Sequence, residues 1–158
     1  MKLIKAVILC LAAFAAVPVV AQEKQADQNM QILLEKVKAD KKLVVAANMD
    51  LTESEGKAFW PIYDAYQQDL QALNDRLGKT IVAYADAYNK KALTDAQAKQ
   101  LMNEVLAIDQ DELTLRKTYL GRFERAIPAT KAARYFQLEN KIRAVIRYQL
   151  AAGIPLVE

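Results

Sequence analysis

The sequence predicts an all-α protein of four helices, in which two long antiparallel helices form an extended hairpin flanked by two shorter helices. Three observations support this fold class. The 158 residues include only four Gly and four Pro, so long stretches run without a helix breaker. Apolar residues recur at steps of three and four positions, as on one face of a helix. Two segments also open with the same helix-capping pattern.

The first 21 residues have the features of a secretory signal peptide. Lys2 and Lys5 give a positive start, and 12 apolar residues follow without interruption over 6–17. Short side chains lead up to Ala21, after which we expect cleavage. The alternative, a membrane anchor, needs about 20 apolar residues to cross the bilayer core. The segment falls short of this length, so we expect export and no stable membrane insertion of the mature chain.

The mature chain is predicted to hold one helical domain over residues 30–155, after a flexible polar lead-in over 22–29. Apolar residues at helical spacing begin at Met30 and predict a first helix that ends near Asn48 to Asp50.

The second helix is predicted to begin after Thr52, which can cap the first turn while Glu55 completes a capping box. A single apolar stripe then continues for about eight turns of 3.6 residues. Its members are Phe59, Tyr63, Tyr66, Leu70, Leu73, Leu77, Ile81, Tyr84 and Tyr88. A stripe of this length needs another long helix beside it. Pro61 lies inside this segment, and we expect it to kink the helix or divide a short first part from the rest.

The third and fourth helices have equally clear signals. Thr94 and Gln97 repeat the capping pattern, and the apolar face that follows predicts a helix to about Ala126. Pro128 suits the first turn of a fourth helix. Gly153, with Pro155 two residues later, is a helix stop.

Charge is distributed unevenly along the chain. Residues 22–115 hold 11 Lys/Arg against 16 Asp/Glu, whereas residues 116–148 hold nine against two. One interpretation is that acidic and basic helices pack together or attract a second copy. The other is a basic surface for acidic partners or anionic lipid. The first is the simpler interpretation, and both stay open at this stage.

The residue inventory argues against an enzyme. The chain has no histidine, its one cysteine (Cys10) lies in the predicted signal peptide, and Ser54 is its only serine. Imidazole bases, thiolates and Ser-His pairs are therefore missing from the mature chain. Asp109, Asp111 and Glu112 are the remaining candidates for acid-base or metal chemistry, but they are better explained as charges that meet Arg or Lys on a neighbouring helix. We expect no catalytic residues, no metal site, no cofactor and, because the chain is exported, no nucleic acid partner.

The two helix starts share one motif. The first is Leu51-Thr52-x-x-Glu55 and the second is Leu93-Thr94-x-x-Gln97. In this setting the chain resembles the Spy/CpxP family of periplasmic proteins, which is named for paired Leu-Thr-x-x-Gln motifs. The resemblance covers about residues 45–145. Glu55 replaces the first Gln. Relatives often carry a further motif before the last helix, and here Ile127-Pro128-Ala129-Thr130-Lys131 stands in its place, so that its Thr and Gln are both lost. These departures argue against a metal-responsive role.

The resemblance implies a periplasmic, ATP-independent chaperone, in which a cradle-shaped homodimer holds unfolded or misfolded envelope proteins under envelope stress. We expect a cluster of basic and aromatic residues on the third helix to contribute to client binding, namely Arg116, Tyr119, Arg122, Phe123 and Arg125. The alternative for these residues is a structural role, with the rings in the core and the arginines in solvent. Alternative functions are an adaptor or inhibitor of an envelope-stress sensor kinase, and a structural helical interaction module.

Overall fold

Two threonines mark the starts of the two longest helices. In the computed structural model, which describes residues 40–157, α2 spans Glu53–Asn89 and α3 spans Asp95–Ala126. The Oγ1 atoms of Thr52 and Thr94 each accept a hydrogen bond at 3.3 Å from the backbone N–H three residues later. The side chains of Glu55 and Gln97 accept the threonine N–H in return. Both helices therefore begin with the complete capping boxes that the sequence predicts.

The described residues are helical apart from short connections. Besides α2 and α3, residues 40–49 form a helix and α4 spans Ala129–Gly153, with Pro128 as its N-cap. No strand occurs between residues 40 and 157, so the all-α class is confirmed. α2 passes through Pro61 as one helix and is not divided there. The predicted signal peptide, the lead-in and the predicted start of the first helix lie outside the described residues.

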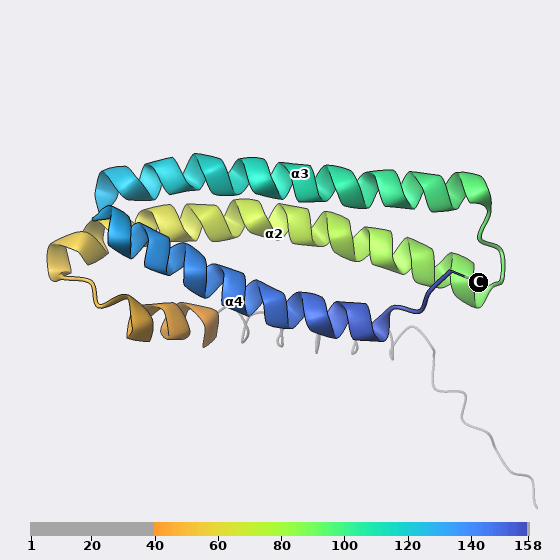
Figure 1. The fold of residues 1–158 in the computed structure, drawn as a ribbon, viewed down its shortest axis with the longest axis horizontal. Helices are drawn as coiled ribbons and strands as arrows, with labels where there is room; N and C mark the ends of the chain where they lie inside the picture. The colour runs from red at the N-terminus through yellow and green to blue at the C-terminus, as the bar shows by residue number, and fades with distance from the viewer. Residues whose placement is uncertain (1–39, 158) are drawn as a thin grey trace, which may run out of the picture. The chain divides into compact units, whose positions relative to one another are not determined.

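α2 and α3 lie side by side and run in opposite directions (Figure 1). Their polar contacts show this register, because partners later in α2 pair with residues earlier in α3. Tyr119 Oη on α3 donates to Asp69 on α2 at 2.6 Å. About two turns later on α2, Arg76 donates at 2.7 Å to Asp111, which precedes Tyr119 on α3. The turn at residues 90–94 has the length typical of a hairpin of two antiparallel helices.

α4 begins beside the C-terminal end of α3 and reaches α2 through long side chains (Figure 1). Gln67 Nε2 on α2 donates to Tyr135 Oη at 3.0 Å and to Glu139 at 2.9 Å, both on α4. Burial is the main cause that raises the pKa of Tyr135, with the Glu139 carboxylate adding to it. Tyr135 therefore remains a neutral hydrogen-bonding group in the core.

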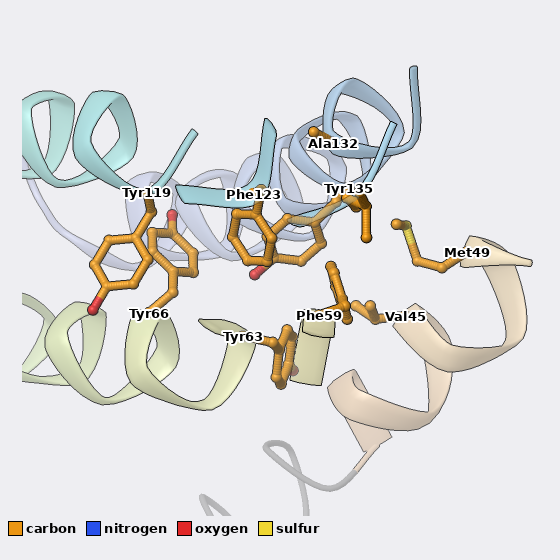
Figure 2. Packing of buried hydrophobic residues seen from close by; sticks show 10 residues of the cluster. Val45, Met49, Phe59, Tyr63, Tyr66, Tyr119, Phe123, Ala132 and Tyr135 are labelled. Carbon is orange, nitrogen blue, oxygen red and sulfur yellow. The ribbon is translucent and has the colours of Figure 1, made fainter. Parts of the chain in front are cut away.

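The core is aromatic and lies where α2 begins, α3 ends and α4 begins. Figure 2 shows Phe59, Phe123 and Tyr135 meeting between the three helices. The Phe123 and Tyr135 ring centroids are 4.7 Å apart, and those of Phe59 and Phe123 are 5.1 Å apart. The other buried members of the cluster are Val45, Met49, Tyr63, Tyr66, Tyr119, Ile127 and Ala132. Each aromatic pair stabilises the fold by about 0.5–1.5 kcal/mol beyond the burial of its apolar area.

Burial of the α2 stripe is uneven along its length. Phe59, Tyr63 and Tyr66 are buried, whereas the six later members are only partly buried. The apolar side chains in the second half of α2 are thus incompletely covered by the described residues. This half of the molecule is where a binding site can form.

Candidate functional site

An apolar groove lies between the second half of α2, the first half of α3, the end of α4 and the residues that follow α4. Its volume is about 510 Å³, which is in the range of small-ligand and peptide pockets. The apolar side chains that line it from the three helices are Leu77, Ile81, Tyr84, Leu101, Met102, Val105, Ile108, Leu150 and Ala151. Met102 is 56% exposed, so the groove presents apolar surface to solvent.

The polar edge of the groove is already neutralised. Arg147 on α4 lines the groove and donates to Asp109, which also lines it. The same guanidinium donates to Glu112 at 3.2 Å. The hydrogen bond that Arg147 donates to Asp109 is the main reason why the pKa of Arg147 is raised. With two carboxylates beside it, Arg147 offers little net charge to an anionic ligand, and the groove favours uncharged apolar groups.

Glu112 is a buried charge held between two arginines. It is 7% exposed, and its carboxylate lies 2.8 Å from Nη1 of Arg143 and 3.2 Å from Nη2 of Arg147. Burial lowers the pKa of Arg143, against the opposing effect of Glu112. The acidic residues considered as acid-base or metal candidates are therefore engaged in ion pairs with arginines, since Asp109 pairs with Arg147 and Asp111 pairs with Arg76.

The C-terminal tail, defined as residues 154–157, lies along the remaining side of the groove and contributes to its lining. α4 ends at Gly153, and the N–H of Ile154 bonds the carbonyl of Leu150 at 3.0 Å. Figure 1 shows the tail running towards the C-terminal end of α2, where Tyr84 Oη donates to the carbonyl of Pro155 at 2.9 Å. Leu156 is 88% exposed, so the tail is attached mainly through Ile154 and Pro155.

The residues of the two Leu-Thr motifs lie at the starts of α2 and α3, and none of them lines the groove. Leu51 packs against the aromatic core, and Leu93 is partly buried. Glu55 also accepts a hydrogen bond at 2.6 Å from Lys131 on α4, and this bond is the main cause that lowers the pKa of Glu55. Lys131 Nζ further donates to the carbonyl of Asp50 at 2.7 Å. Glu55, which stands in place of the motif Gln, thus connects the start of α2 to α4.

The structure places the predicted client-binding cluster of α3 partly in the core and partly at the surface. Tyr119 is 2% exposed and Phe123 is fully buried, so neither ring presents a surface to a client. The helical spacing that places both rings on one face of α3 reflects their packing in the core. Arg122 lies over the Tyr119 ring at 4.5 Å from its centroid. Arg122 and Arg125 are exposed and Arg116 is partly buried, so only the arginines of this cluster stay available to partners.

The groove could not be predicted from helical spacing alone, because its lining comes from segments far apart in the sequence. The apolar residues at 154–157 directly after the Gly153 stop were the available signal.

Comparison with protein-family models, with curated proteins and with solved structures gives no match for this chain. The resemblance to the Spy/CpxP family thus rests on the two helix-start motifs and their setting. None of the helices described between residues 40 and 157 combines the length and the apolar character needed to cross a membrane.

Proposed function

We propose that this chain is a non-enzymatic, chaperone-like protein of the periplasm that holds apolar segments of unfolded or misfolded envelope proteins. The observation that carries the proposal is the groove of about 510 Å³, lined by apolar side chains and open to solvent. Unfolded chains expose the same kind of apolar side chain, and contact with the groove removes both surfaces from water.

The composition of the groove suits weak and broad recognition. Its lining includes Leu, Ile, Val, Tyr and one Met, and these side chains make contacts without fixed hydrogen-bond geometry. Flexible apolar surfaces of this kind bind promiscuously. A groove of this size contacts only a few client side chains, and the loss of freedom on binding offsets much of the gain. We therefore expect release without an energy source, as an ATP-independent holding function requires.

The test is suppression of aggregation of a chemically denatured client at near-stoichiometric ratios. Met102 lines the groove, and Leu106 lies one helical turn later on α3 without lining it. The two side chains are 56% and 60% exposed, so they form a matched pair. Met102→Lys should reduce suppression about threefold to tenfold, as expected for the loss of about 0.7–1.4 kcal/mol. Leu106→Lys should leave suppression unchanged.

Two results would contradict the proposal. Equal suppression by both variants would show that the groove does not hold clients. Saturable binding of one folded partner, with no effect on aggregating clients, would instead favour an adaptor such as an inhibitor of a sensor kinase. Size-exclusion chromatography of the same protein gives its oligomeric state, which we propose to be a homodimer.

A further inference from the structure

We infer that the C-terminal tail is a built-in occupant of the groove, which an extended apolar client segment displaces. The inference rests on the proposed function and names its ligand class and its regulation. The tail is itself a short apolar peptide that leaves the helix with Ile154 in an extended conformation. It lies against the apolar surface of the groove, so the molecule already contains one example of the segment that the groove accepts.

The way in which the tail is held indicates how a client is recognised. Tyr84 Oη donates to the carbonyl of Pro155, and a backbone carbonyl is present in every peptide whatever its sequence. The Tyr84 ring also lines the groove. One tyrosine therefore offers an apolar face and a donor to any extended segment. Because Arg147 is already paired with Asp109 and Glu112, the groove favours an uncharged apolar peptide over an anionic lipid or fatty acid.

The attachment of the tail is weak enough to be reversible. Leu156 and Val157 are 88% and 62% exposed, so their side chains gain little from the groove. The hydrogen bond from Tyr84 is exposed to water, where competition with solvent leaves a small net contribution. A site that is covered for part of the time has its apparent affinity reduced by the covered fraction. Removal of the tail should therefore increase client affinity about threefold to tenfold.

The experiment uses a fluorescein-labelled peptide with the sequence of residues 153–158 and three variants of the full chain. Deletion of residues 155–158 keeps Ile154, whose N–H caps α4. Tyr84→Phe keeps the ring and removes the donor. Tyr148→Phe is the matched control, because Tyr148 is 76% exposed on α4 and does not line the groove. Circular dichroism checks that each variant keeps its helical content.

We expect the peptide to bind the deletion variant about threefold to tenfold more tightly than the full chain. Methyl resonances of Ile81 and Ile108, which line the groove, should shift on binding, and those of the 61% exposed Val82 should not. A denatured client should show the same increase. Tyr84→Phe should release the tail, so the tail resonances of this variant should move towards those of a free peptide. Because the same donor would also hold the added peptide, this variant should bind it more weakly. Tyr148→Phe should match the unmodified chain.

Failure of this inference differs from failure of the proposed function. Equal or weaker peptide binding by the deletion variant, or tail resonances unchanged by Tyr84→Phe, would overturn the inference even if clients are still held. A second outcome is that the peptide binds the groove of the deletion variant, but the protein does not reduce aggregation of clients. The tail is then an occupant of the groove, and the proposed holding function is wrong.

Discussion

The carboxylate of Glu112 on α3 lies 2.8 Å from the guanidinium of Arg143 on α4, and this ion pair lies midway between the aromatic core and the groove. Beyond the core, α4 carries exposed apolar residues such as Val145 and Ile146, which do not hold it to its neighbours. The charges of Glu112, Arg143 and Arg147 therefore help to keep the second half of α4 in place, together with its partly buried apolar residues. Since this half of α4 forms one wall of the groove, the ion pairs also position the candidate site.

Replacement of Glu112 by Gln should destabilise the protein by about 1–3 kcal/mol, because Arg143 loses the charge that compensates its partial burial, while Arg147 keeps Asp109 as a partner. The value is below that for a fully buried pair, since the side chains of Arg143 and Arg147 are 29% and 46% exposed. Urea denaturation measures the change, with Glu124→Gln on the exposed face of α3 as the control. A loss below about 0.5 kcal/mol, the range of ordinary surface substitutions, would show that the pair contributes nothing.

Phe123→Ala should destabilise the protein by about 3–5 kcal/mol, as expected when a buried aromatic side chain leaves a cavity. Phe123 is fully buried, whereas Leu106 on the same helix is 60% exposed. Leu106→Ala should therefore change stability by less than about 0.5 kcal/mol. Thermal and urea unfolding of both variants give the comparison. If Phe123→Ala instead lost client binding at unchanged stability, the ring would belong to a client surface and not to the core.

The helix starts could be predicted from the sequence because their signals are local. Thr52 and Glu55, and likewise Thr94 and Gln97, satisfy each other within one turn, so no distant part of the chain decides the outcome. The end of α4 at Gly153 is similarly local. Glu112 stood out on an apolar stripe, which is the signal of a buried charge with a partner.

The candidate site was predicted poorly because periodicity shows which residues share a face and not what covers that face. Tyr119 and Phe123 share a face that α2 and α4 cover, and they are core residues. Ile81 and Val105 have the same spacing signal, but the helices leave them at a groove. Only the divergence of α4 and the return of the tail distinguish the two ends, and both depend on contacts between segments far apart in the sequence.

The link between Glu55 and Lys131 should make stability depend on pH. The hydrogen bond from Lys131 lowers the pKa of Glu55 below its ordinary value of 4.5. The unfolded chain therefore binds a proton at Glu55 more readily than the folded chain does. The stabilisation is complete above pH 4.5 and is lost as the pH falls through the lower folded pKa. Glu55→Gln keeps the capping box and removes this dependence.

The measurement is the melting temperature of the unmodified chain and of Glu55→Gln between pH 7 and pH 2. The unmodified chain should be the more stable of the two at pH 7, and the difference should shrink below pH 4.5. Glu53→Gln is the control, because Glu53 forms an exposed ion pair with Lys57 on the same helix. A difference that stays constant over the whole range would contradict the proposed role of the Lys131 contact.

The exposed arginines of α3 should influence how fast clients arrive and not how firmly they are held. Arg122 and Arg125 are exposed and lie at the aromatic-core end of α3, away from the groove at its other end. The double change to Gln removes two positive charges, which lowers electrostatic attraction of an acidic client. At low ionic strength we expect a severalfold slower association, and at 1 M salt, where the screening length is about 3 Å, no difference.

Stopped-flow fluorescence with an acidic unfolded client measures the association rate at both salt concentrations. The control is the double change of Lys79 and Lys99 to Gln, which removes the same charge from exposed positions elsewhere. Loss of client binding by the arginine variant at high salt would mean that the guanidinium groups themselves hold the client, because only short-range contacts survive such screening.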